Sequence, residues 1–464
     1  MNDLRLFVAF VAVVLGPALR ADTFLDAEKE GKISELLRES GVPSVSVAIA
    51  EHGEVVYAKA FGEAAIAPDR EASPSTRYFV GSVSKQFTAA AVLLAAEAGR
   101  LSLDDRVAKY YPELTRAGDI TIRQLLSHTS GYEDFAPQDY AIPDWARATS
   151  PEAVIRAWAG KPLDFEPGTR WQYSNTNYVI AARIFEKATG ETLVPFLGRV
   201  IFGPLGMTTA TDGYLDRRAS DAVPYTRYAL GPPRPAVPEG PGWYYGAAQL
   251  AMTPSDLARW DIAVLHHRIL SEKSYRDLTG AVSLRNGDLT HYALGLGIGE
   301  MNRIPRIEHS GEVSGFLTSN AIFPTRDTAI VVCSNEDSVN LFETVARQLA
   351  RWLLKPAGGE AAPAQPAELS QVRSILDGLR GGVVDRSLLT PNLSSYFSPT
   401  ALGDIQESLK PLGPVKSLDR NFEMLRGGMT FRDYRVGLEK GSLDLTVYQT
   451  PDGRFEQFLI TQDL

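Results

Sequence analysis

The chain has 464 residues, of which 44% are hydrophobic and 22% are charged, a composition typical of a globular protein with two or three domains. The formal net charge of -9, from 47 basic and 56 acidic residues, argues against nucleic acid or an anionic membrane as the main partner. The single cysteine, Cys333, excludes an intramolecular disulfide and, within the apolar run AIVVCSN, is expected to be a buried thiol rather than a zinc ligand.

The N-terminus has the layout of a secretory signal peptide. Arg5 precedes the apolar run from Leu6 to Leu15, and small residues follow up to a cleavage site near Ala21. A run of about ten apolar residues is too short to span a bilayer. We therefore expect residues 1–21 to be a signal peptide, a periplasmic or secreted location, and no stable membrane insertion beyond the signal. The acidic Asp3 leaves a retained anchor as the alternative.

The next elements start in strands, pass through helices and return to strands. Residues 24–40 have helical periodicity, and runs rich in Val and Ala over 44–64 predict a hairpin around the His52-Gly53 turn. Helical and loop segments occupy residues 82–270. Strand-like runs and a closing helix then follow at 292–301, 306–324, 328–335 and 340–354. This order predicts one sheet built from both ends of the region, with a helical domain inserted.

The C-terminal part of the chain reads as a separate unit. Residues 356–368 are rich in Pro, Ala and Gly with no apolar period, which predicts a linker. Beyond it, a helical pattern and three alternating runs predict a small α+β module over residues 369–464, with strands at 429–439, 442–450 and 453–460. A curled antiparallel sheet of this kind is similar in shape to nuclear-transport-factor-2-like domains.

The stretch GSVSKQFTAAAVLLAAEAG, residues 81–99, predicts a helix that is nearly all apolar from Gln86 to Gly99 and whose first turn holds Ser82 and Lys85. Residues i and i+3 share one face of a helix, so the hydroxyl and the amine lie side by side. Burial disfavours the charged form of a lysine, which would leave an amine able to accept the serine proton. The alternative is structural: Ser82 as a helix cap and Lys85 extending its amine to solvent.

Two further motifs lie downstream. Tyr173-Ser174-Asn175 follows the Pro167-Gly168 turn, just before a helix predicted from Tyr178. A tyrosine held in a loop can relay a proton, and an asparagine can both donate to and accept from an amide, although such residues also cap helices.

The triplet His309-Ser310-Gly311 falls in a strand-like run, where glycine permits close approach of another backbone segment or of a substrate. A second histidine, His128 in LLSHTSGY, is interpreted as a structural turn or capping residue.

The order and spacing of Ser-x-x-Lys, Tyr-x-Asn and a basic-x-Gly strand are the arrangement of serine penicillin-recognising enzymes. With the phrases TIRQLLSHTSGY, FEPGTRWQYSN, PLGMTTA and MTPSDLARW, the chain resembles the class C β-lactamase and D-alanyl-D-alanine carboxypeptidase superfamily, whose members include esterases and D-aminopeptidases. The resemblance runs from Ile33 to Leu354. It implies an α/β (α+β) fold of the β-lactamase/transpeptidase type over residues 22–355, with a central antiparallel sheet flanked by helices and an inserted helical domain.

The resemblance also implies a serine hydrolase that needs no metal and no organic cofactor. Ser82 would attack a carbonyl and form an acyl-enzyme, with Lys85 as its base and Tyr173 relaying a proton to the leaving group. His309 would share protons with Tyr173 and Ser82. The residues expected to bind the substrate are Asn175, Ser310, Gly311 and Glu312. Asn175 would orient the substrate amide, and the backbone N–H of Glu312 would form an oxyanion hole with that of Ser82.

Two departures bear on specificity. β-Lactamases of this superfamily usually have lysine where this chain has His309, and the His-x-Gly form is more typical of the carboxypeptidase, D-aminopeptidase and esterase branches. The carboxylate of Glu312 would repel a substrate carboxylate. We therefore expect a peptidase or esterase that acts on a small peptide or ester that is neutral or bears an amine. The alternatives are a true β-lactamase and a non-catalytic penicillin-recognising sensor; the sequence does not indicate an oligomeric state.

Overall fold

The computed structural model describes residues 24–301, 304–354, 369–426, 429–450 and 452–462. The expected signal peptide, residues 1–21, and the expected linker, residues 356–368, lie outside this description. Among the described helices, none combines the length and the apolar character that crossing a membrane requires.

A large antiparallel sheet organises the first three quarters of the described chain. It joins strands from the start of the chain to strands from residues 297–334, because β1 pairs with β12. Within the described residues its order is β3 (Arg70–Glu71), β2 (Glu54–Ala65), β1 (Ser44–Glu51), β12 (Thr328–Ser334), β11 (Phe316–Phe323), β10 (Ile304–Val313) and β9 (Gly297–Met301). The predicted sheet built from both ends is confirmed.

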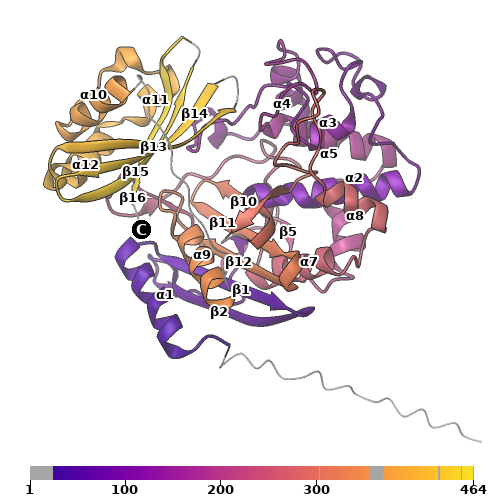
Figure 1. The fold of residues 1–464 in the computed structure, drawn as a ribbon, viewed down its shortest axis with the longest axis horizontal. Helices are drawn as coiled ribbons and strands as arrows, with labels where there is room; N and C mark the ends of the chain where they lie inside the picture. The colour runs from indigo at the N-terminus through magenta and orange to yellow at the C-terminus, as the bar shows by residue number, and fades with distance from the viewer. Residues whose placement is uncertain (1–23, 302–303, 355–368, 427–428, 451, 463–464) are drawn as a thin grey trace, which may run out of the picture.

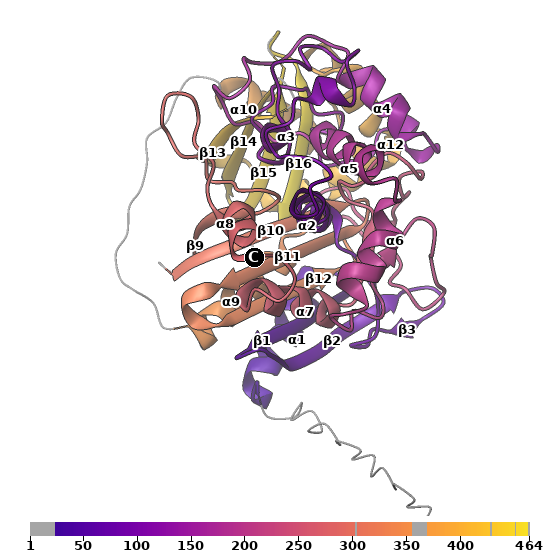
Figure 2. The ribbon, with the colours of Figure 1, turned by 90° about the vertical axis from the view of Figure 1, so that its right-hand side faces the viewer.

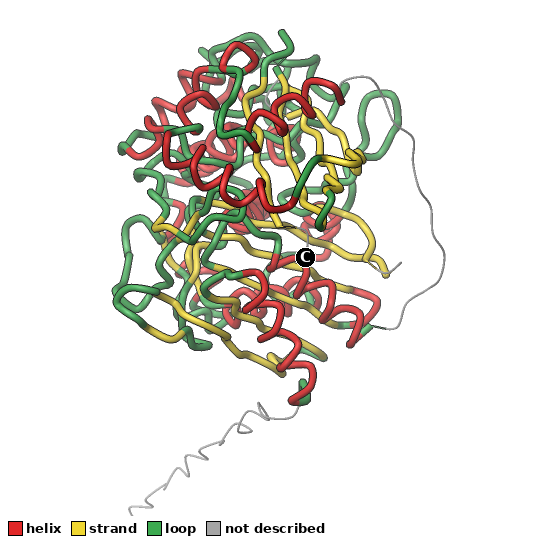
Figure 3. Tube along the Cα trace, turned by 90° about the vertical axis from the view of Figure 1, so that its left-hand side faces the viewer, coloured by secondary structure: helices red, strands yellow, loops and turns green. Residues whose placement is uncertain are grey.

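The sheet separates two apolar cores, and the alternation of side chains along its strands explains why. Val45, Val47 and Ile49 of β1 point to the face covered by α1 (Ala27–Ser40) and α9 (Leu341–Leu353). Ala48 and Ala50 point to the opposite face. Successive side chains of a strand face opposite sides, so both faces require apolar residues when helices cover both. Figure 3 shows the strands of this sheet between helices.

The opposite face is covered by the predicted helical region. Its helices in chain order are α2 (Ser84–Glu97), α3 (Ile122–Leu126), α4 (Pro151–Trp158), α5 (Asn175–Thr189), α6 (Leu193–Leu197), α7 (Pro254–Leu265) and α8 (Glu272–Thr279). Helix α2 contacts α5, α6 and α8 and shares a core with β1 and β12, which explains why most of its side chains after the first turn are apolar. Cys333 is buried in this core, as expected.

Short strands that were not predicted complete the helical region. The described residues there form a three-stranded sheet and a two-stranded sheet, made of β4 (Tyr78–Phe79), β8 (Leu250–Met252), β5 (Thr211–Asp212), β6 (Tyr225–Thr226) and β7 (Arg234–Pro235). Each is only two or three residues long, too short for a period-two pattern to be visible.

The C-terminal module has its own apolar core. Its described elements are α10 (Leu369–Arg380), α11 (Pro391–Tyr396), α12 (Pro399–Leu409), β13 (Val415–Arg426), β14 (Met429–Leu438), β15 (Gly441–Gln449) and β16 (Phe455–Gln462), and the strands pair in chain order. The predicted helix and three strands are confirmed. Strand β13 was missed because it is an edge strand with many charged residues. The likeness to nuclear-transport-factor-2-like domains stays a prediction.

The module lies beside the helical region, above the edge of the large sheet that ends in β10 and β9 (Figures 1 and 2). The Arg234 guanidinium donates to both carboxylate oxygens of Asp404 on α12, at 2.8–3.0 Å. The Tyr396 ring on α11 packs against Tyr140 and Tyr228, with ring centroids 5.0 and 5.3 Å apart. Charged and aromatic contacts therefore hold the module against the rest of the chain.

Candidate active site

Ser82 and Lys85 meet at the start of α2. Ser82 lies in the short 3-10 turn Gly81–Val83, which runs directly into α2, and Lys85 is fully buried. The Lys85 Nζ donates to Ser82 Oγ at 2.9 Å, to Asn175 Oδ1 at 2.7 Å and to the Ala247 carbonyl at 3.1 Å. These partners are all neutral groups. Such an arrangement directs the lysine amine at the serine hydroxyl.

Tyr173 and Asn175 complete this cluster. Helix α5 begins at Asn175, not at Tyr178 as expected, because the polar residues of its first turn bond to the loop over 130–136 instead of to solvent. The Asn175 N–H donates to Asp134 Oδ1 at 2.8 Å, and its Nδ2 lies 3.3 Å from both Asp134 Oδ2 and the Ala136 carbonyl. The amide is thereby fixed with its oxygen towards Lys85, whose Nζ lies 4.8 Å from the Tyr173 ring centroid.

His309 lies in β10 and lines the same pocket, but its contacts differ from expectation. Its Nδ1 donates to the Ser310 carbonyl at 2.5 Å, so its Nε2 accepts from the Tyr292 hydroxyl at 2.8 Å. Burial, together with the proximity of Lys85, lowers the pKa of His309 to about 3, so the imidazole is neutral near pH 7. Both nitrogens are engaged by Ser310 and Tyr292, rather than by Tyr173 and Ser82 as expected.

Two glycines allow β10 to pass against the turn that carries Ser82. A Cβ on Gly311 would lie 1.9 Å from the Val80 carbonyl oxygen, and a Cβ on Gly81 would lie 2.4 Å from the Glu312 nitrogen. Gly81 also has a φ of 52°, a left-handed conformation that favours glycine. The close backbone approach anticipated for Gly311 is therefore present.

This approach brings two backbone N–H groups to the same side of the pocket. Val313 pairs with Phe316 across the two-residue turn of the β10–β11 hairpin, so the alternation of an antiparallel ladder leaves the Glu312 N–H pointing away from β11. The Ser82 N–H belongs to the first turn of a helix, where an N–H has no partner within the helix. The pair has the arrangement of an oxyanion hole.

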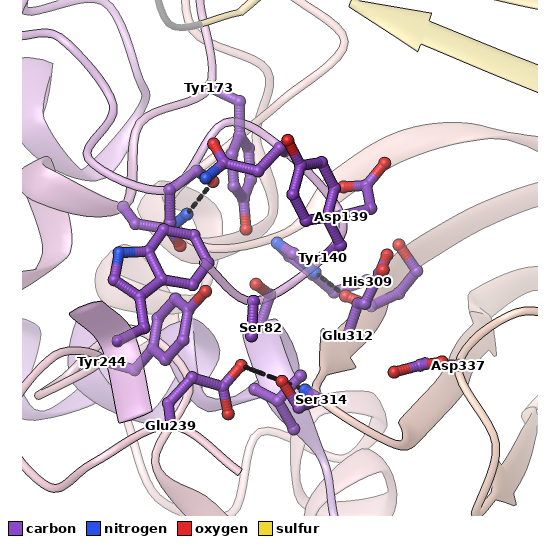
Figure 4. A pocket seen from close by; sticks show the side chains of 17 residues that line it. Ser82, Asp139, Tyr140, Tyr173, Glu239, Tyr244, His309, Glu312, Ser314 and Asp337 are labelled. Atoms are coloured by element: carbon purple, nitrogen blue, oxygen red, sulfur yellow. Dashed lines mark hydrogen bonds between the residues drawn. The ribbon is translucent and has the colours of Figure 1, made fainter. Parts of the chain in front are cut away.

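The pocket above Ser82 encloses about 220 Å³ and is strongly acidic. Figure 4 shows Ser82 with Tyr173 and His309 on its walls and carboxylates around its rim. The acidic side chains lining it are Asp139, Glu239, Glu312 and Asp337. Among the described residues that line this pocket there is no lysine and no arginine. Ser310 is exposed and lines both this pocket and a neighbouring groove.

Two of these carboxyl groups are held in the pocket wall by neutral partners. Glu239 is buried and accepts hydrogen bonds from the N–H and the hydroxyl of Ser314, at 3.1 and 2.9 Å. Asp337 accepts from the Gly315 N–H at 2.7 Å. Burial raises the pKa of both carboxyl groups.

Several of these residues were missed by sequence reasoning. Tyr292, Glu239 and Asp337 come from loops far apart in the chain and carry no local motif. His128 was interpreted correctly as structural: it has a φ of 59°, and its Nδ1 accepts the Ser174 N–H at 3.2 Å. Among the described residues, no group of three or more His, Cys, Asp or Glu side chains is placed to hold a metal ion.

Comparison with known proteins assigns the class. Residues 30–365 match the sequence profile of the Beta-lactamase family, so the chain belongs to that family. It is 27% identical over 310 residues to the "Putative penicillin-binding protein PbpX" of Bacillus subtilis (strain 168), covering 66% of this chain and 74% of that protein. It is 28% identical over 336 residues to "Penicillin-binding protein 4*" of the same organism, covering 69% and 74%.

Solved structures share the fold. The octameric penicillin-binding protein homologue from Pyrococcus abyssi superposes with a TM-score of 0.62 at 20% identity, over 93% of this chain and 99% of that chain. D-amino acid amidase from Ochrobactrum anthropi SV3, complexed with D-phenylalanine, gives a TM-score of 0.61 at 22% identity, over 70% and 98%. The protein is a serine hydrolase of the β-lactamase family, related to penicillin-binding proteins.

Proposed function

We propose that the protein is a serine amidase, peptidase or esterase whose substrate is neutral, or bears an amine, close to the scissile bond. The observation that carries this proposal is the acidic wall of the pocket above Ser82, in which no described lining residue is a lysine or an arginine. A carboxylate on the substrate would meet these side chains at short range. Repulsion between two like charges about 4 Å apart is worth roughly 4 kcal/mol in a partly desolvated site.

The reaction follows from the geometry of the cluster. The base is the uncharged form of Lys85, whose two N–H bonds can stay on Asn175 and Ala247 while its lone pair faces Ser82 Oγ, 2.9 Å away. This amine accepts the Ser82 proton as the hydroxyl oxygen attacks the substrate carbonyl, and the N–H groups of Ser82 and Glu312 stabilise the oxyanion. Tyr173 passes a proton to the leaving amine or alkoxide, which leaves an acyl group on Ser82. Water then attacks the ester, the proton path reverses, and the free acid and the Ser82 hydroxyl are released.

The buried carboxyl groups add a reason to favour an amine. Glu239 and Asp337 have lost solvent, and their described partners are hydroxyl and N–H groups without charge. A bound ammonium would offset the desolvation of these carboxylates, whereas a bound carboxylate would add to it. The solved neighbour described as a D-amino acid amidase, complexed with D-phenylalanine, is compatible with this choice.

A panel of substrates that share a scissile bond and differ in charge tests the proposal. Amino-acid p-nitroanilides of both configurations with a free amine are expected to give at least tenfold higher kcat/KM than the same compounds succinylated on the amine, because only the latter carry a carboxylate. The measurement is initial rate on the mature protein, with Ser82→Ala as the blank. The isosteric variant Glu312→Gln keeps the backbone N–H and removes one carboxylate. It is expected to reduce the ratio of kcat/KM between the free-amine and the succinylated substrates.

Two outcomes would contradict the proposal. Efficient hydrolysis of a chromogenic cephalosporin, better than any free-amine substrate and lost in Ser82→Ala, would identify a β-lactamase. A fluorescent penicillin that labels Ser82 permanently, with no turnover of any amide or ester, would identify a sensor.

We also propose that the protein is exported, on the N-terminal sequence alone. If the signal is removed at the expected site, N-terminal sequencing of protein recovered outside the cytoplasm begins at Asp22. Recovery of the full-length chain from the cytoplasm would contradict export.

A further inference from the structure

The loop over residues 133–142 forms one wall of the pocket and is held by the C-terminal module. Gln457 on β16 is fully buried, and its side-chain oxygen accepts the Asp139 N–H at 2.5 Å. Its side-chain nitrogen donates to Asp139 Oδ2 at 2.9 Å and to Thr446 Oγ1 at 3.0 Å. The next loop residue, Tyr140, donates its hydroxyl proton to the Glu456 carbonyl at 2.8 Å. Two adjacent loop residues are thus held by two adjacent residues of one strand.

The same loop reaches the reacting atoms at its other end. Asp134 and the Ala136 carbonyl bind the side chain of Asn175, and Asn175 accepts from Lys85, which donates to Ser82. The segment from Asp134 to Tyr140 therefore runs from the catalytic lysine's partner to the module. Its position depends on hydrogen bonds at both ends, because it contains no helix or strand of its own.

A second hollow lies next to the pocket above Ser82 and encloses about 330 Å³. The two share lining residues: Asp139, Tyr140, Ala141, Glu312, Ser314 and Asp337. The far wall of the second hollow belongs to the module, through Tyr396, Leu459 and Ile460. Leu317 and Phe342 line it from the large sheet and α9, so it has more apolar surface than the first pocket. Arg227 and Arg234 also line it, and their guanidinium groups donate to backbone carbonyls and to Asp404, respectively.

We infer that the C-terminal module is part of the substrate site: Gln457 positions the Asp139–Tyr140 loop over Ser82, and Leu459 with Ile460 lines a subsite for an apolar group of the substrate. This inference rests on the proposed function and deepens it. The substrate class is then an amide or ester with a neutral or amine-bearing group at the acidic pocket and an apolar group in the adjoining hollow. Gln457 is a positioning residue, since it acts through Asp139.

The first test replaces Gln457 with leucine, which keeps the size of the side chain and removes both bonds to Asp139. The matched control is Gln449→Leu on β15, whose side chain bonds to Arg432 and Gly453 inside the module. We expect Gln457→Leu to lower kcat/KM tenfold to a hundredfold, as loss of positioning does, and Gln449→Leu to leave it within threefold. Equal effects of the two variants at equal thermal stability would overturn the positioning role.

A rescue experiment covers the case in which Gln457→Leu fails to fold. Gln457→Glu keeps the shape but sets a second carboxylate against Asp139, and we expect a loss of at least tenfold in kcat/KM. Adding Asp139→Asn to that variant restores a donor opposite the new acceptor, and we expect recovery of a substantial part of the loss. A double variant no better than Gln457→Glu alone would contradict the link between these two residues.

The apolar subsite is tested by substrate size. Leu459→Ala is expected to lower kcat/KM about tenfold for leucine or phenylalanine p-nitroanilide and to leave the alanine compound unchanged. The control is Leu412→Ala, at a half-buried leucine of the same module that lines neither hollow. It should change kcat/KM by the same factor for the leucine, phenylalanine and alanine compounds. Equal effects of Leu459→Ala on large and small substrates would overturn the subsite.

Labelling of Ser82 by a fluorophosphonate separates the two levels of inference. If wild-type protein is labelled and turns over amides, but the module variants match their controls, the module inference fails and the proposed function stands. If Ser82 is not labelled and no substrate is turned over, the proposed function itself fails.

Discussion

Ser82→Ala is expected to lower kcat by roughly 10⁴- to 10⁶-fold, and Lys85→Met by nearly as much, because a nucleophile and its base act as one unit. The Lys85 Nζ lies 2.9 Å from Ser82 Oγ, so removal of the amine leaves the hydroxyl without its base. The double variant should lose little more than either single variant. Steady-state rates with the best substrate of the panel, and burst amplitudes, measure all three.

Controls separate chemistry from folding in this series. Lys85→Met leaves Asn175 Oδ1 and the Ala247 carbonyl buried without the lysine donor, which costs about 1–3 kcal/mol for each group that stays unsatisfied. A lower Tm with retained near-UV circular dichroism is therefore expected, and rates are compared per folded molecule. Lys109→Met, at an exposed ion pair with Asp105, should keep full activity. Activity of Ser82→Ala above a hundredth of wild type would contradict the assignment of the nucleophile.

The sequence predicts the parts of this site that depend on local spacing. Ser82 and Lys85 are three residues apart at a helix start, and the triplet at His309 lies on one strand, so short-range geometry places their side chains. The sheet was predictable for the same reason, since its strands carry period-two or continuous apolar runs bounded by turns. That the three motifs come together in one site was inferred from their order along the chain, and not from any single motif.

The acidic character of the pocket could not be predicted from local spacing in the sequence. Glu239 lies in the loop between β7 and β8, and Asp337 lies in the loop between β12 and α9, about a hundred residues further along the chain. In the sequence, each is an ordinary acidic residue of a loop. Only the folded chain brings them to the β10–β11 turn, where they bond to Ser314 and Gly315. The same limit applies to Tyr292, which fixes the neutral imidazole of His309 from outside the strand that carries it.

The role of histidine in the third motif changes once the structure is considered. A lysine at this position would present a cation to the substrate, whereas His309 is buried, neutral and bonded to Ser310 and Tyr292. The acidic rim and the neutral imidazole therefore act in the same direction. The acidic side chains would repel a substrate carboxylate and the neutral imidazole would offer it no cation, and this agreement is the basis of the specificity proposed above.

Gly311→Ala is expected to have the second-largest effect, because the new Cβ would lie 1.9 Å from the Val80 carbonyl oxygen and the strand must move. Movement of β10 shifts the Glu312 N–H away from the Ser82 side chain. Loss of one oxyanion donor lowers kcat by about 10²- to 10³-fold. Overpacking of this kind also lowers the free energy of unfolding by about 1–3 kcal/mol. Urea denaturation and the rate per folded molecule measure the two effects separately.

Gly299→Ala on β9 is the matched control, since its Cβ would meet only Glu308 Oε1, at an ordinary 3.7 Å. Both glycines lie in neighbouring strands of one sheet, and neither has a positive φ, so they differ mainly in what stands opposite the added methyl group. We expect Gly299→Ala to change kcat less than threefold. If Gly311→Ala retained kcat to the same extent, the β10 backbone would not be supplying the oxyanion donor, and the stabilising group would have to be sought on another element.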